Sequence, residues 1–182
     1  MFWKSIAALS LIATLSGPRP TAVAAPVREP VPARHDKALS VRELDELRTL
    51  YKQLIDDENA HDIAAVRRMV WKSPSALFVA KTKTPAEGNW AGFWGTNTVV
   101  EHINDLFQSG TFVMAPDYDR EKIVQLSRDV MQTYVPITIS VAYAGQTGTP
   151  KPFLMIVEWV KDHGEWKMAT DIALPIPPAP AQ

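Results

Sequence analysis

The order of helical and strand patterns along the chain is the feature that most restricts its fold. From Ile123 to Pro175 one strand pattern follows another, whereas the patterns before this region are helical. The segment Val157–Ala169 predicts an apolar strand, a tight turn at Gly164 and a second strand that opens at Trp166. Helices followed by a run of antiparallel strands are typical of the α+β class, which we expect here.

Three helices are predicted before the strands. Ser40 and Glu43 form a capping box at the start of the first, in which apolar residues recur at helical spacing. Asp62 is the expected N-cap of a second, short helix that runs through Val70 and ends at Ser73-Pro74. Thr96 or Thr98 is expected to cap the third helix, which ends at Gly110. The apolar positions of the first helix are Leu44, Leu47, Tyr51, Leu54 and Ile55.

The predicted strands begin with a short one over 76–80. A loop is expected to follow it through Pro85 and Gly88, carrying the aromatic residues of the segment 90–94. The β-rich region 123–143 alternates apolar and polar residues, and Ser127-Arg128-Asp129 is either a turn or a bulge within it. After a loop over 145–150, the strands 153–161 and 166–174 are expected to pair as a hairpin.

The N-terminal residues have the pattern of a signal peptide. A short basic start precedes an apolar run from Ile6 to Leu15, and Ala22-Val23-Ala24 matches a signal-peptidase site. We expect cleavage after Ala24, a proline-rich linker over 25–39, one domain over 40–175 and a proline-rich tail over 176–182. The protein would then be periplasmic or secreted, without stable membrane insertion, because a span needs about 20 apolar residues. An uncleaved N-terminal anchor is the alternative.

Composition excludes several classes of function. Loss of Lys4 and Arg19 with the signal changes the formal charge from −1 to −3, which argues against nucleic-acid partners. The chain has no Cys, so disulfides, Cys-zinc sites and thiol catalysis are excluded. His35, His61, His102 and His163 lack metal-ligand spacing, and no phosphate-binding loop is present. We therefore expect no metal and no cofactor.

The element order, the Asp62 helix start and the Gly164-Glu165-Trp166 turn resemble the NTF2-like superfamily, and its SnoaL-like members in particular. This resemblance covers roughly 40–174. It implies a cone-shaped fold in which three helices pack on a strongly curved antiparallel sheet around an apolar cavity. Ketosteroid isomerases of this superfamily would place a carboxylate base near Val79 to Lys81 and an acid near Val157. Neither position offers such a group here, so that chemistry is not expected.

Asp171 and His102 are the candidate catalytic residues. Asp171 lies in a late strand whose other face carries Trp166, Met168, Thr170 and Ile172, and the resemblance implies an acid on such a strand. If its side chain lines the cavity, burial would raise its pKa and suit it to acid or base catalysis. His102 lies on the third helix beside Ile103, where an imidazole could transfer protons. The alternatives are an ion pair or solvent exposure for Asp171, and a surface or core role for His102.

Aromatic residues are the candidate ligand-binding groups. Trp90, Phe93 and Trp94 fall within five residues, which is unusual for a loop unless the rings cover a surface. They could line an apolar pocket or form a core plug or a dimer contact. The full set of candidates is Tyr51, Trp90, Phe93, Trp94, Phe107, Tyr134 and Trp159.

Three functions follow as hypotheses. The first is an exported NTF2-like domain whose pocket binds a small, largely apolar molecule. The second is a SnoaL-like cyclase, dehydratase or hydrolase that uses general acid/base catalysis by Asp171 and His102. The third is a homodimeric protein-interaction module.

Overall fold

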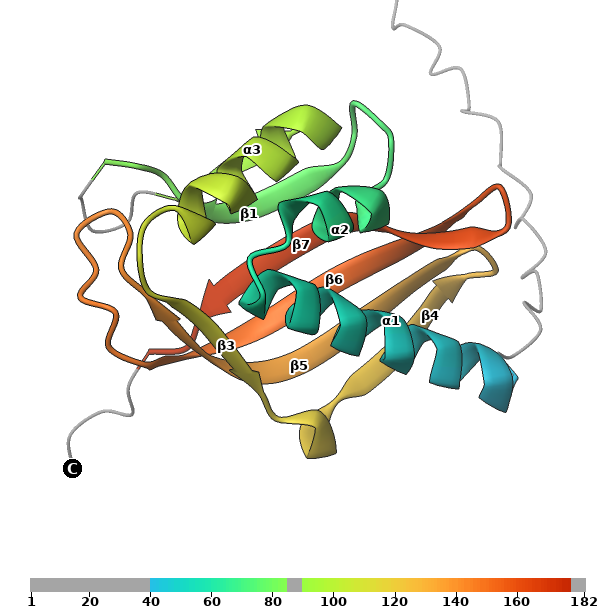
Figure 1. Ribbon diagram of the computed structural model, residues 1–182. Helices are drawn as coiled ribbons and strands as arrows, with labels where there is room; N and C mark the ends of the chain where they lie inside the picture. Colours follow the sequence, from blue (N-terminus) through green and yellow to red (C-terminus); the bar gives the residue numbers. More distant parts are fainter. Residues whose placement is uncertain (1–39, 85–89, 178–182) are drawn as a thin grey trace, which may run out of the picture. The chain divides into compact units, whose positions relative to one another are not determined.

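The computed structural model describes residues 40–84 and 90–177, which form one mixed sheet with helices packed on one of its faces (Figure 1). The predicted signal peptide, the linker and most of the proline-rich tail lie outside these residues. Among the described helices, none is long and apolar enough to cross a membrane. The α+β class is confirmed.

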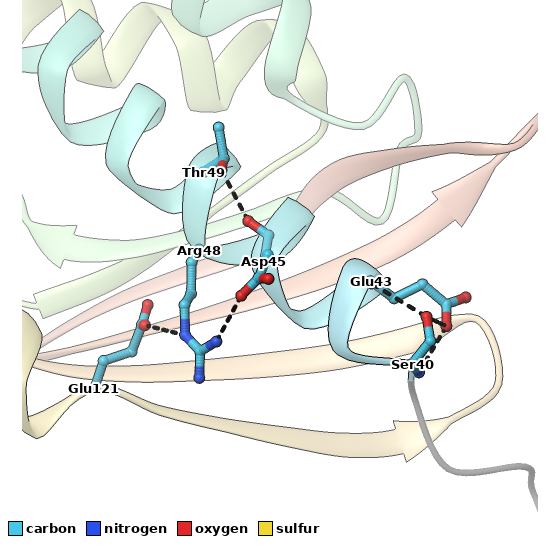
Figure 2. Close-up of polar contacts among 6 residues, drawn as sticks. All are labelled: Ser40, Glu43, Asp45, Arg48, Thr49 and Glu121. Atoms are coloured by element: carbon cyan, nitrogen blue, oxygen red, sulfur yellow. Dashed lines mark hydrogen bonds and ion pairs between the residues drawn. The ribbon is translucent and has the colours of Figure 1, made fainter.

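The helices α1 (Val41–Asn59), α2 (Ile63–Met69) and α3 (Thr96–Phe107) match the predicted ones. The capping box of α1 is present: the Glu43 N–H donates to Ser40 Oγ at 3.3 Å, and the Ser40 N–H donates to Glu43 Oε2 at 3.0 Å (Figure 2). Asp62 caps α2 by accepting the Ala65 N–H. The N-cap of α3 is Gly95, not a threonine, and the Thr96 hydroxyl instead donates to the Trp71 carbonyl.

Arg48 links α1 to the sheet. Its guanidinium lies 2.9 Å from the Asp45 carboxylate on the same helix (Figure 2). It also lies 3.4 Å from the carboxylate of Glu121, the residue that precedes the strand β4 (Lys122–Ser127). Arg48 and Asp45 are largely exposed, whereas the Glu121 side chain is only 7% exposed. The ion pair therefore joins a largely buried acid to the outer surface of α1.

The strands form a sheet in the order β2-β1-β7-β6-β5-β3, and β4 also pairs with β5. Their bounds are β1 (Leu77–Lys81), β2 (Trp90–Trp94), β3 (Phe112–Pro116), β4 (Lys122–Ser127), β5 (Val130–Val141), β6 (Lys151–Asp162) and β7 (Glu165–Pro175). A 3₁₀ turn, η1 (Tyr118–Arg120), separates β3 from β4, and both pair with the same edge of β5. The turn between β4 and β5 and the hairpin of β6 and β7 are where the sequence predicts them.

Three features of the sheet differ from the predictions, and one of them is β3, in a segment for which no strand was predicted. The segment 90–94 is not a loop but the edge strand β2, which pairs with β1 from Trp94–Leu77 to Trp90–Lys81. The sheet is mixed rather than wholly antiparallel, because β1 pairs in parallel with β7. The core lies between the helices and the inward side chains of the strands, with Tyr51, Leu54 and Trp159 among its fully buried members.

Candidate functional site

Helix α1 carries two polar side chains into the core. Its buried positions Leu47, Tyr51, Leu54, Ile55 and Glu58 follow the helical repeat, so the last residue of the apolar stripe is a glutamate. Glu58 is 2% exposed and Tyr51 is fully buried. Glu58 was not among the candidates from the sequence, although its spacing from Tyr51 and Leu54 was a visible signal.

Strand β7 carries the third polar group, Asp171. A register shift separates the pair Glu158–Thr170 from the pair Trp159–Met168, which leaves Ala169 as an extra residue in β7. Trp166 and Met168 face the core before this bulge, and Asp171 faces it afterwards. The expectation that Asp171 lies on the face opposite Trp166 and Met168 is therefore wrong. Its side chain is 1% exposed and points inward.

Glu58 and Asp171 line one end of a small, mainly apolar cavity. The cavity volume is about 50 Å³. Since one water molecule needs roughly 15 Å³ of such volume, the cavity has room for about three waters. Helices α1 and α3, strand β1 and the inner face of the sheet supply the walls. The apolar lining residues are Phe78, Ala80, Ile103, Leu106, Phe112, Met114, Ile139, Val141, Phe153, Met155 and Ala173.

Burial dominates the electrostatics of the acid pair. It raises the pKa of Asp171 from 3.8 to about 7, and desolvation is the only cause. The pKa of Glu58 is raised well above its usual value, first by burial and then by the negative charge of Asp171 and Asp57. Burial, Asp171 and Glu58 also raise the pKa of Tyr51, in that order. Burial therefore favours the protonated forms of Glu58 and Tyr51, and Asp171, with a pKa of about 7, is partly ionised at neutral pH.

The Asp171 carboxyl also lacks hydrogen bonds to the described residues. Among the described residues, neither of its carboxyl oxygens has a hydrogen-bond partner, and the Tyr51 hydroxyl has none either. Buried polar groups in folded proteins are nearly always paired, so unpaired ones call for a structural or functional reason. The acid end of the cavity thus offers unused acceptors to a molecule inside it.

His102 lies beside the cavity rather than in its lining. It is buried and stacks on Phe93, with ring centroids 3.6 Å apart, and it contacts Phe78 and the edge of Tyr143. Burial lowers the pKa of His102 despite a hydrogen bond with the Lys81 backbone. A neutral imidazole packed among rings is therefore the form that the structure favours, and His102 and Asp171 do not line the same cavity.

The other aromatic candidates lie in different environments. Trp90 lines the cavity, whereas Phe93 is not among its lining residues and stacks on His102. Trp94 is 59% exposed. Phe107 stacks on His61 in the core, and Tyr134, half-buried, donates its hydroxyl to Gln132. Trp159 is fully buried and its indole N–H donates to Thr133 Oγ1 at 3.3 Å.

In the described part of the chain, no three His, Asp or Glu side chains are grouped as a metal ion requires. The acid pair has two carboxyls with apolar surroundings, which is too few ligands for a stable cation site. The chemistry that these residues can do is therefore hydrogen bonding and proton transfer.

Comparisons with known proteins concern the fold. No family model matches the sequence, and no curated protein matches it. A protein with a cystatin-like fold from Caulobacter vibrioides has a TM-score of 0.62 and 10% identity, with 75% of this chain and 92% of that chain covered. An NTF2-like protein of unknown function from Pseudomonas putida KT2440 has a TM-score of 0.58 and 10% identity, with coverage of 79% and 93%. The fold is NTF2-like.

An NTF2-like protein from Cytophaga hutchinsonii is similar too, with a TM-score of 0.54, 18% identity and coverage of 76% of this chain and 100% of that chain. At such identities the likeness extends to the fold alone. The function of this NTF2-like domain must therefore be argued from its own cavity.

Proposed function

We propose that the domain binds a small, largely apolar molecule in the cavity and that a polar group of this molecule pairs with Asp171. The observation that carries the proposal is the Asp171 carboxyl, which is 1% exposed, opens on the cavity and has no hydrogen-bond partner among the described residues. An unpaired buried acid destabilises the fold, and a bound donor would remove that cost. The apolar walls supply the remaining binding energy.

The test is an NMR titration of the full chain with primary alcohols of three to six carbons, which carry one donor and an apolar tail. Amide shifts should change around the cavity and give a saturating curve at millimolar concentration. Ala173→Leu fills the cavity and should weaken binding at least tenfold. Ile172→Leu, on the opposite face of the same strand, should leave it unchanged. No cavity shifts with any of these alcohols would overturn the proposal.

General acid/base catalysis is the second candidate function. The acid pair favours it, because burial raises the pKa of both carboxyls and brings that of Asp171 to about 7, where proton transfer near neutral pH is efficient. Asp171 would accept a proton from the bound molecule and Glu58 would donate one. This assignment replaces His102, which packs beside the cavity, with Glu58 as the partner of Asp171.

Butan-2-one in deuterated water tests this candidate with a small ketone. Asp171 would remove a proton from the carbon beside the carbonyl, and Glu58 would hydrogen-bond to the carbonyl oxygen, where the electron pair moves. Return of a deuteron from the solvent restores the ketone, so exchange is visible by proton NMR. Asp171→Asn should lower the exchange rate at least tenfold, whereas the exposed Glu165→Gln should not. Equal rates in all three proteins would remove the candidate.

An interaction module is favoured by one observation, the 59% exposure of Trp94 on the edge strand β2. A dimer that buries this ring would dissociate in Trp94→Ala, which sedimentation over a range of concentrations would detect. A monomer at every concentration would exclude the interaction module.

Export is a separate proposal, supported by the signal-peptide pattern that ends at Ala24. Identification of the N-terminal residue of the protein isolated from its own cells tests this proposal.

A further inference from the structure

The cavity has a second polar end, formed by Tyr143, Gln146 and Lys81. Tyr143 is 8% exposed and lines the cavity, and its hydroxyl has no hydrogen-bond partner among the described residues. The structure thus leaves a buried phenol hydroxyl unpaired as well as a buried carboxyl, and both belong to residues that line the same space.

The two polar ends lie at different levels of the sheet. Asp171 pairs with Val157, which pairs with Thr133 in β5. Tyr143 lies just beyond β5, and its ring contacts His102, which in turn contacts Phe78, the residue of β1 that pairs with Asp171. The inward side chains between these levels are apolar and line the cavity, among them Met155, Phe153 and Ile139. A ligand that reaches both ends must therefore cross an apolar stretch.

The hydrogen-bonding character of the two ends is different. An ionised Asp171 can only accept hydrogen bonds, so it selects a donor. Burial raises the pKa of Tyr143, which keeps the phenol protonated and able to donate. His102 contacts the Tyr143 ring edge-on with centroids 5.6 Å apart and holds the ring from the side of α3. Gln146, whose backbone N–H donates to the Tyr143 carbonyl, also lines the cavity.

We infer that the ligand has a hydrogen-bond donor, such as a hydroxyl, at the end that faces Asp171 and a carbonyl oxygen at the end that faces Tyr143, with a short apolar chain between them. This inference rests on the proposed binding of a small apolar molecule and names its chemical class. It assigns Tyr143 as a residue that determines specificity.

The experiment uses the full chain and a matched panel of compounds in NMR titrations. 4-Hydroxybutan-2-one and 5-hydroxypentan-2-one supply both groups at two separations. Primary alcohols and methyl ketones with the same number of carbons supply one group each. The proteins are the wild type, Tyr143→Phe and Asp171→Asn, with Tyr134→Phe on the outer face of β5 as a control.

We expect one hydroxyketone to bind at least tenfold more tightly than the alcohol of the same length. Tyr143→Phe should abolish this advantage and leave alcohol affinity unchanged, and Asp171→Asn should weaken alcohols and hydroxyketones alike. Tyr143→Phe should also melt no lower than the wild type, because it loses only an unpaired hydroxyl. Tyr134→Phe should behave as the wild type.

The failures of the two proposals are distinguishable. If alcohols bind in the cavity but no hydroxyketone gains affinity, or if the gain survives in Tyr143→Phe, the inference about the second end is overturned and the proposed function stands. If no compound of the panel binds, both are overturned.

Discussion

Met168 and Asp171 face the same side of the sheet although an odd number of positions separates them. Regular alternation would put them on opposite faces, and the extra residue at Ala169 restores Asp171 to the core side. The bulge also lets Met168 pair with Trp159 while Asp171 pairs with Val157, so that all four side chains are buried. One additional residue thus changes an outward carboxyl into an inward one.

The stability of the protein should fall as pH rises from about 4 to 7. The folded-state pKa of Asp171, about 7, lies above its unfolded value, so the folded state binds more protons throughout this window. The part of the loss that comes from Asp171 is complete above its folded pKa and amounts to at most about 4 kcal/mol. Glu58, whose pKa is also raised by burial, adds a loss of the same sign. Denaturant unfolding at a series of pH values measures it.

Asp171→Asn is the matched variant for this titration. It should make the slope between pH 4 and 7 shallower, with the remainder due to Glu58, and be more stable than the wild type at pH 8, since the amide carries no charge. Asp129→Asn, in the exposed turn between β4 and β5, should keep the wild-type slope. A wild type that gains stability over the same window would contradict the placement of Asp171 in a desolvated site.

Arg48→Met should expose the dependence of Glu121 on its partner. Burial raises the pKa of Glu121 and Arg48 opposes this, so loss of the guanidinium leaves a largely buried carboxylate uncompensated. Because Arg48 is itself 54% exposed, we expect a loss of only about 1 kcal/mol at pH 8. The loss should shrink at pH 4, where Glu121 is protonated. Asp45→Ala, which removes the exposed partner of Arg48, should cost little at either pH.

Asn59→Ala should detach the end of α1 from the edge of the sheet. The Asn59 amide donates to the Met114 carbonyl at 2.9 Å and accepts the Met114 N–H at 2.7 Å, as a neighbouring strand would. Loss of both bonds should cost about 1–2 kcal/mol of unfolding free energy. Gln53→Ala, which removes an exposed hydrogen bond to Asp57 on the same helix, should stay within about 0.5 kcal/mol of the wild type. Equal effects would contradict the role given to Asn59.

Substitutions in the hairpin turn at 163–164 should differ in their effect on the stability of the protein. His163 and Gly164 have φ values of 49° and 88°, and a two-residue hairpin of this kind favours Asn-Gly. Gly164→Ala should cost about 1–2 kcal/mol, because a Cβ is disfavoured at positive φ. His163→Asn should be neutral or stabilising. Thermal melts of both variants against the wild type would show whether backbone conformation determines the stability of this turn.

Local signals explain which parts of the fold could be predicted. Ser40, Glu43 and Asp62 act on backbone groups a few residues away, so the sequence contains all that is needed to place the starts of α1 and α2. The Gly164 turn is similarly local, and the β6–β7 hairpin was predictable for that reason. Gly95 in place of a threonine as the N-cap of α3 depends on the approach of Trp71, which is distant in sequence.

Long-range pairing explains what could not be predicted. The segment 90–94 becomes a strand because it pairs with β1, and its aromatic residues gave no periodic signal. The parallel pairing of Leu77–Val79 with Thr170–Ile172 joins segments from distant parts of the sequence. Within the site, Glu58 had the spacing of a core position but the residue type of a surface position, so its burial becomes visible only with Asp171 and the cavity in place.

The parallel pairing of β1 with β7 also has a consequence for the order of folding. Hairpins such as β6–β7 close through local contacts, whereas β1 must wait for the last strand of the sheet. Such non-local closure slows folding, typically to milliseconds or seconds. More than a hundred residues separate Glu58 from Asp171, so the two acids meet only after nearly all of the domain has been synthesised. A nascent chain that stops before β7 would contain α1 with Glu58. It would lack Asp171 and the part of the cavity wall that β7 supplies.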